Sequence, residues 1–101
     1  MVKSRKIRLI DVRGAMKKIS FQENKNIIHD RLRQHRKAKG LTQGQVAARL
    51  QTMNVNLDQQ ALSKIENNRR IVTDYELACL CRALEVTERE LLADFYERPE
   101  S

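Results

Sequence analysis

Glycine and proline are scarce in this chain, which has 3 Gly and 1 Pro in 101 residues. An all-β fold of many short strands needs frequent turn residues, so their scarcity argues against such a fold. No apolar run approaches the roughly 20 residues that a membrane-spanning helix requires. The basic amino-terminal region also lacks the continuous apolar stretch of a secretory signal. These absences favour a small, cytoplasmic helical bundle, which is the simplest way to bury a core in so short a chain.

Side chains that support catalysis or hold metals are also few. Cys79 and Cys81 lie at i, i+2 in a helical pattern, so their side chains point to different faces of the helix. A metal site would need about two more ligands nearby, and the two histidines, His29 and His35, are far upstream. We therefore interpret the cysteines as buried, reduced thiols. The sequence has no Gly-rich phosphate loop and no plausibly spaced nucleophile–base pair, so we expect neither an enzyme nor a cofactor.

The net charge of +7 is unevenly distributed along the chain. Residues 1–20 carry seven Lys or Arg and one Asp, for +6, and residues 21–70 carry ten Lys or Arg and four acids, again for +6. Residues 71–101 carry three Arg and eight acids, for −5. A basic front and an acidic back are typical of a protein that docks one face onto a polyanion. The alternative is ordinary solvated charge.

Helix starts are marked by four capping-box segments of the type S/T-x-x-E/Q, at residues 20–23, 42–45, 73–76 and 87–90. Each lies just before a run with helical apolar periodicity, and Asp58 is a further N-cap candidate. With a first helix over about 26–39, the pattern predicts five helices and an all-α fold. The residues expected to form the core include Ile28, Leu32, Val46, Ala47, Leu50, Ala61, Leu62, Ile65, Leu80, Cys81, Leu84, Leu91 and Leu92.

The chain divides into three parts. Residues 1–19 are a basic leader that we expect to be flexible. Because Met16 is an alternative start, residues 1–15 are either native or an upstream addition. Residues 20–96 form the predicted helical domain, and residues 97–101 form a short carboxyl-terminal tail.

The helix expected from residue 59 has one apolar and one polar face. Gln59 and Gln60 lie in its first turn, which is the part of a recognition helix that enters a major groove deepest. Glutamine pairs with adenine and lysine with guanine at the base edges, whereas amides at a helix start hold phosphate. The alternative is that both glutamines are only solvated. The residues expected to face DNA are Gln43, Gln59, Gln60, Ser63, Lys64, Asn67, Arg69 and Arg70.

Three motifs carry a family resemblance: Leu41-Thr42-Gln43, Val46-Ala47, and Leu62-Ser63-Lys64-Ile65-Glu66-Asn67. They resemble the helix-turn-helix domain of the lambda-repressor-like (Cro/C1, or Xre) family, over about residues 27–95. The resemblance implies a five-helix all-α domain that binds operator DNA, usually as a dimer. It also implies a structural salt bridge between Arg36 and Glu66.

The chain departs from the family pattern between its second and third helices. The segment 51–56 is longer than the usual short turn, so either the second helix gains about a turn or the connection is extended. Asn68 replaces the usual glycine after the third helix, and asparagine also adopts the left-handed conformation needed there.

The function predicted from these features is a sequence-specific, DNA-binding transcriptional repressor of bacterial or phage type. Its partners would be double-stranded operator DNA and a second copy of the chain. We expect the dimer surface on the last helix, at Leu91, Phe95 and Tyr96. Two alternatives stay open: an antitoxin that binds both DNA and a toxin, and a protein-interaction module that uses this fold without an operator.

Overall fold

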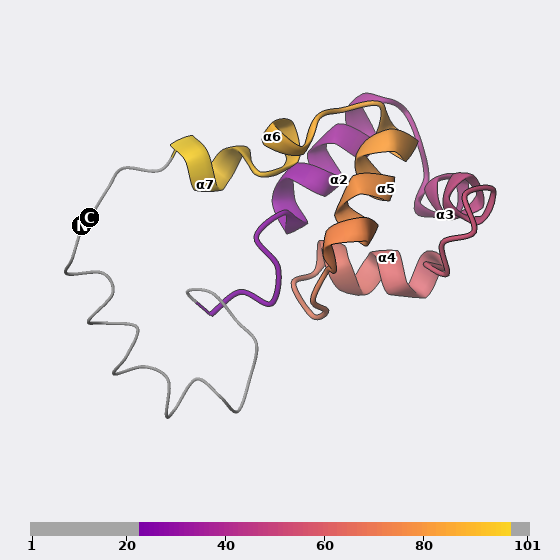
Figure 1. The fold of residues 1–101 in the computed structure, drawn as a ribbon, viewed down its shortest axis with the longest axis horizontal. Helices are drawn as coiled ribbons and strands as arrows, with labels where there is room; N and C mark the ends of the chain where they lie inside the picture. Colours follow the sequence, from indigo (N-terminus) through magenta and orange to yellow (C-terminus); the bar gives the residue numbers. More distant parts are fainter. Residues whose placement is uncertain (1–22, 98–101) are drawn as a thin grey trace.

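The computed structural model describes residues 23–97, and the regular elements of this part of the chain are all helices, which confirms the predicted all-α fold class. The leader (residues 1–19), most of the capping box at 20–23 and most of the tail lie outside the described residues. No helix between residues 23 and 97 is long and apolar enough to cross a membrane. The helices are α2 (His29–Ala38), α3 (Gln43–Gln51), α4 (Gln59–Glu66), α5 (Asp74–Leu84), α6 (Glu88–Leu91) and α7 (Ala93–Glu97) (Figure 1).

The sequence-predicted caps determine where four of these helices begin. The threonines that precede α3, α5 and α6 each accept a hydrogen bond from the third helical backbone N–H. The side-chain oxygen at that third position in turn accepts from the backbone N–H of the threonine. Asp58 caps α4 by accepting from the backbone N–H of Ala61 at 2.8 Å. Because each cap satisfies backbone groups that have no partner within the helix, each stabilises its helix by about 1 kcal/mol.

The first helix begins at His29, later than the predicted residue 26. Asn26 is the reason, because its side-chain oxygen accepts from the backbone N–H of Ile28 at 3.2 Å and closes a turn just before the helix. Asn26 is itself buried, at 8% exposure, and so fixes this non-helical entry.

The last predicted helix is divided in two at Leu92. Leu92 ends α6 and its carbonyl then accepts from the backbone N–H groups of Phe95 and Tyr96, at 2.9 and 3.3 Å. The break lets Leu91 point into the core, where it is fully buried, while α7 continues along the surface.

The connection between α3 and α4 is extended, and α3 is not lengthened. After Gln51 the chain turns at Asn54, whose φ is 61°, and the backbone N–H of Val55 donates back to the carbonyl of Leu50 at 3.1 Å. Val55 and Leu57 then enter the core at 5% and 0% exposure, although neither is among the predicted core residues. Their alternation with exposed Asn56 is the sequence signal of an extended, half-buried segment.

The packing places α4 along one side of the bundle. In Figure 1, α4 lies at the bottom, with α2 and α5 above it and α6 and α7 at the upper left. α4 packs against both α3 and α2, and α3 also packs against α5. The largest fully buried side chains of the shared core are Leu32, Leu50, Leu57, Leu62, Ile65, Leu80, Leu84 and Leu91.

The cysteines lie on α5 as free thiols, Cys81 buried and Cys79 half-buried. Burial, together with the charges of Glu88 and Glu90, raises the pKa of the Cys81 thiol to about 11. The thiol is therefore protonated and unreactive at neutral pH. Within residues 23–97, no three His, Cys, Asp or Glu side chains are grouped so as to hold a metal ion.

Replacing Leu57 with alanine should lower the free energy of unfolding by about 2–5 kcal/mol, because it removes a fully buried side chain and leaves a cavity. Asn56→Ala is the matched control, and as an exposed neighbour it should change stability by less than about 0.5 kcal/mol. Urea unfolding followed by circular dichroism measures both. Equal, small losses would show that the connection contributes nothing to the core.

Candidate nucleic-acid interface

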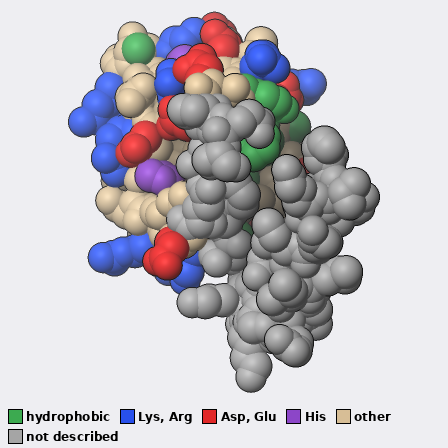
Figure 2. Space-filling view, turned by 90° about the vertical axis from the view of Figure 1, so that its left-hand side faces the viewer, with side chains coloured by type: hydrophobic (Ala, Val, Ile, Leu, Met, Phe, Trp, Pro, Cys, Tyr) green, Lys and Arg blue, Asp and Glu red, His purple; other side chains and the backbone are tan. Residues whose placement is uncertain are grey.

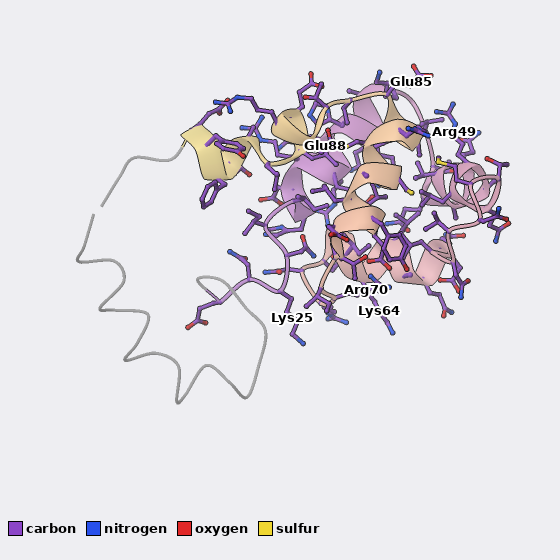
Figure 3. All side chains as sticks on the ribbon, in the orientation of Figure 1. Lys25, Arg49, Lys64, Arg70, Glu85 and Glu88 are labelled. Atoms are coloured by element: carbon purple, nitrogen blue, oxygen red, sulfur yellow. The ribbon has the colours of Figure 1, made fainter. Side chains whose placement is uncertain are left out.

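The two faces of α4 separate as its periodicity predicts. Leu62, Ile65 and Glu66 are buried against the bundle. The other face is polar and lies outward, with Lys64 pointing away from the bundle at its lower side (Figure 3). The structure brings the five predicted α4-face residues together on this outward face, where Ser63 is half-buried and the others, Gln59, Gln60, Lys64 and Asn67, are exposed.

The first turn of α4 lies against the start of α3. A Cβ atom at Gly44 would lie 3.5 Å from the side-chain oxygen of Gln59, so that side chain reaches back toward the α3 amino-terminus. Gln60 is exposed on the same turn. Gln59 therefore lies beside the starts of both α3 and α4, whose first backbone N–H groups favour negative charge.

A buried carboxylate joins α4 to the helices on either side. The Glu66 side chain, which is 1% exposed, accepts from Arg36 Nε at 2.7 Å and from Arg36 Nη2 at 3.0 Å. Arg36 also donates to the carbonyl of Leu41 at 2.9 Å. The pair implied by the family resemblance is thus present as a bidentate contact between α2 and α4.

Two further side chains complete this cluster. Gln43 Nε2 donates to Glu66 Oε1 at 3.0 Å, and Arg33 Nε lies 3.6 Å from the same oxygen. Burial alone raises the pKa of the Glu66 carboxyl, but the hydrogen bonds from Arg36 and Gln43 and the charges of Arg36 and Arg33 outweigh it, so the pKa lies below its ordinary value. We call these four residues the Glu66 cluster. The side-chain nitrogen of Gln43 therefore donates within this cluster, and the backbone N–H groups of the first turn of α3 are the remaining donors at this position.

The carboxyl-terminal end of α4 is held by a second set of contacts. Asn67 donates to the backbone carbonyl of Ser63 at 2.8 Å, and its side-chain oxygen accepts from Arg33 Nη2 at 3.3 Å. Arg33 also donates to the carbonyl of Glu66 at 2.8 Å. Arg33 is a partly exposed cation at the edge of the polar face that sequence reasoning missed, because only the packing of α2 on α4 brings it there.

The two arginines after α4 have different surroundings. Arg69 is exposed. Arg70 instead makes a bidentate contact with Glu76 of α5, at 2.9 and 3.0 Å, and its hydrogen bond is the main reason why the pKa of the Glu76 carboxyl lies below its ordinary value. The geometry therefore favours a structural role for Arg70, which ties the segment after α4 to α5, over the predicted phosphate contact.

Together these features define a helix-turn-helix unit. Two short helices, α3 and α4, are joined through a buried polar cluster, and the second presents a polar face with glutamines in its first turn. Proteins of this class insert that second helix into the major groove of DNA.

A family model described as a helix-turn-helix domain matches residues 30–95. The chain belongs to this helix-turn-helix family and is of the lambda-repressor-like type, and so is a DNA-binding transcriptional regulator. Among solved structures, it is similar to the restriction-modification controller protein C.AhdI from Aeromonas hydrophila. The sequence identity is 31% and the TM-score is 0.56, over 63% of this chain and 86% of that one. No curated protein matches the chain.

Glu66→Gln should lower the free energy of unfolding at pH 7 by about 3–5 kcal/mol, because it leaves the Arg36 guanidinium without its counter-charge in a mostly buried site. The pKa of Glu66 is lowered by folding, so the stabilisation from its ionised form is complete above the ordinary carboxyl pKa and is lost as the pH falls through the lowered value.

The difference between wild type and Glu66→Gln should therefore be constant from pH 6 to 8 and should narrow below about pH 4.3. Urea unfolding at each pH measures it. Glu88→Gln, at an exposed position, is the control and should stay within about 0.5 kcal/mol of wild type at pH 7. A constant difference down to pH 3 would contradict a charged Glu66 in the cluster.

Proposed function

We propose that this protein is a transcriptional repressor that binds an operator as a homodimer, with α4 in the major groove. The observation that carries the proposal is the polar outer face of α4, backed by the buried Glu66 cluster. Because the carboxylate on the inner face of α4 is hydrogen-bonded to both α2 and α3, the outer face is held in one orientation before DNA arrives. Such preorganisation is what base-edge recognition requires.

Base contacts are assigned by donor and acceptor chemistry. Gln59 and Gln60 would pair with adenines, and Lys64 would donate to guanine O6 and N7. Ser63 and Asn67 would contact the same groove, and Asn67 Nδ2 limits the freedom of both side chains because it donates to the Ser63 carbonyl at 2.8 Å and to Ser63 Oγ at 3.3 Å. The outer face of α4 therefore supplies both donors and acceptors, as sequence readout needs.

Phosphate contacts are assigned to groups at the rim of this face. The first turn of α3 offers backbone N–H groups at a helix start, and exposed Arg69 and partly exposed Arg33 offer guanidinium groups. Phosphate contacts fix the register of the protein on the duplex without reading sequence. Repression would then follow from occupancy of the operator. The similarity to a restriction-modification controller protein supports a regulator of this type.

The dimer surface is proposed on the side that carries α7. Phe95 and Tyr96 are 45% and 50% exposed there, and a groove of about 500 Å³ lies beside them. Figure 2 shows this side, on which green hydrophobic side chains form a small patch among charged ones. Leu91 was also predicted for this surface, but it is fully buried in the core of its own domain and is therefore not part of the proposed dimer surface. The apolar residues that line the groove are Ile27, Ile28, Val72, Leu77, Leu92 and Phe95.

A two-fold axis on this side would suit DNA binding. In Figure 1, α4 runs from right to left, so its carboxyl-terminal end is the one nearer to the side of α7, and a second copy placed on that side would extend the row of α4 helices along one DNA face. Half-sites read by such a dimer are about 34 Å apart, one turn of the duplex.

Selection of bound sequences from random duplex DNA should return a palindromic motif with half-sites about 10 base pairs apart. Gln60→Ala should then weaken binding to that motif by about 1–3 kcal/mol and relax the preference at one position in each half-site. Fluorescence anisotropy with the selected duplex and single-base variants measures both. Gln51→Ala, an exposed glutamine at the far end of α3, is the control and should leave affinity unchanged. A uniform loss across all sequences would contradict base reading by Gln60.

Phe95→Glu should shift the protein from dimer to monomer in sedimentation velocity, because it places a charge in the apolar patch on α7. The monomer should bind a half-site but lose the tight binding to the full palindrome. Glu97→Gln, on the same helix but outside the patch, should remain dimeric. Unchanged assembly of Phe95→Glu would move the dimer interface elsewhere.

A further inference from the structure

Three side chains are hydrogen-bonded in series at the outer face of α4. Asn67 Nδ2 donates to the carbonyl of Ser63 at 2.8 Å and to Ser63 Oγ at 3.3 Å. Arg33, which comes from α2, donates through Nη2 to Asn67 Oδ1 at 3.3 Å and to the carbonyl of Glu66 at 2.8 Å. We call Arg33, Asn67 and Ser63 the Ser63 network.

The orientation of the Asn67 amide follows from its two partners. A guanidinium group only donates hydrogen bonds, and a backbone carbonyl only accepts them. Arg33 on one side therefore requires the amide oxygen, and the Ser63 carbonyl on the other side requires the amide nitrogen. Turning the amide over would oppose two donors on one side and two acceptors on the other. The network thus permits only one orientation of this amide.

The direction of hydrogen bonding at Ser63 follows in turn. A serine hydroxyl has one donor hydrogen, which rotates to suit its neighbours, and two acceptor lone pairs. Because Asn67 Nδ2 offers only hydrogens, Ser63 Oγ is the acceptor in their contact. Within residues 23–97, Ser63 Oγ is hydrogen-bonded only as this acceptor. Its own hydrogen is therefore directed away from Asn67 and is available to a ligand.

Ser63 lies in the middle of the polar face of α4. It is four residues after Gln59 and four residues before Asn67, so the three side chains follow one stripe of the helix. Ser63 is half-buried between these two exposed neighbours in the sequence of the stripe. The next residue, Lys64, points away from the bundle in Figure 3. The hydroxyl thus belongs to the part of α4 proposed to read bases and not to its rim of phosphate contacts.

We propose that Ser63 is a specificity-determining residue that serves only as a hydrogen-bond donor to DNA, and that Asn67 and Arg33 are the positioning residues that make it so. The ligand is a base carbonyl in the major groove, O6 of guanine or O4 of thymine. Adenine and cytosine carry amino groups at the same place, so each would oppose its own donor to that of Ser63. The inference rests on the proposed operator binding and names the chemistry that one operator position must present.

The network also gives Arg33 and Asn67 separate roles in binding. Both atoms of the Asn67 amide have partners, so this side chain acts on base preference through Ser63. The charge of Arg33 attracts phosphate whatever the sequence, whereas its hydrogen bond to Asn67 acts on one base position. The two effects of Arg33 are therefore measured separately, as affinity for all duplexes and as preference at a single position.

Operator duplexes that lack one major-groove group test the direction of the hydrogen bond. The analogues 2-aminopurine and 5-methyl-2-pyrimidinone lack guanine O6 and thymine O4, whereas purine and 2-pyrimidinone lack adenine N6 and cytosine N4. Each analogue is placed at every matching position of the selected motif, and fluorescence anisotropy measures its effect on affinity. Because an analogue also alters base pairing, the quantity of interest is the wild-type loss compared with the loss in Ser63→Ala.

At one position in each half-site, removal of the carbonyl should weaken the wild type about 2- to 12-fold more than Ser63→Ala, as expected for one hydrogen bond. This position identifies the base that Ser63 contacts. Removal of an amino group should affect both proteins equally at every position. An excess wild-type loss on removal of an amino group would overturn the proposal, because Ser63 would then be an acceptor.

Asn67→Ala tests the positioning role. At the identified position, changing guanine to adenine, or thymine to cytosine, replaces the contacted carbonyl with an amino group. The resulting loss of affinity should be about 2- to 12-fold smaller in Asn67→Ala than in the wild type, because the freed hydroxyl then accepts from the amino group. In the Ser63→Ala background, Asn67→Ala should leave this loss unchanged. A loss of affinity that is equal on all duplexes would show that Asn67 only stabilises α4, and would overturn its positioning role.

Arg33→Gln and Arg69→Gln form a matched pair of charge deletions at the rim. Both should weaken binding to all duplexes, because each removes a cation near phosphate. Only Arg33→Gln should also reduce the preference at the position read by Ser63. Equal preference in the two variants would overturn the role of Arg33. Circular dichroism melting establishes that each variant is folded.

The outcomes distinguish this proposal from operator binding itself. If the wild type selects no motif from random duplexes, operator binding fails. If it selects a motif but Ser63→Ala responds to every analogue as the wild type does, only the assignment of Ser63 is overturned.

Discussion

The position of one buried carboxylate governs this domain. Glu66 lies on the inner face of α4, removed from water, and its two oxygens are shared among Arg36 of α2, Gln43 of α3 and, more distantly, Arg33. A carboxylate so placed is costly to bury unless all of these donors are present at once. The cluster therefore forms only when α2, α3 and α4 are correctly positioned relative to one another. The apolar core supplies most of the stability, but the cluster selects the one packing in which the outer face of α4 is usable.

Other polar contacts also hold α4 in position. Arg70 and Glu76 connect the segment after α4 to α5. Asn68, just after α4, is hydrogen-bonded to Asn24 in the segment before α2. Asn67 and Arg33 limit the motion of the last turn. In the described part of the chain, α4 is thus fixed at its start, its middle and its end. None of these contacts uses the residues Gln60 or Lys64, which remain available to DNA.

Local signals were sufficient to predict most of the fold. Caps such as Thr42 and Asp58 act within one turn, so their meaning can be read from neighbouring residues, and the helices that follow them begin as predicted. Pairings between distant residues cannot be read in this way. From the sequence, Arg70 was expected to be available to phosphate, because no local pattern pairs it with Glu76. Gln43 was expected to contact DNA, and only the structure shows that its side-chain amide donates to Glu66. The polar face of α4 was therefore predictable as a set, whereas the partner of each side chain at its border required the packing of α2, α3 and α5.

The extended connection between α3 and α4 has a consequence for the thermodynamics of recognition. A longer loop ordinarily adds conformational freedom that must be lost on binding. Here Val55 and Leu57 are already buried, so the added residues are ordered before DNA arrives. Association then requires no coupled folding in this region, and its heat-capacity change should reflect only the surface covered at the interface. The longer connection therefore adds residues to the chain without adding a flexible segment.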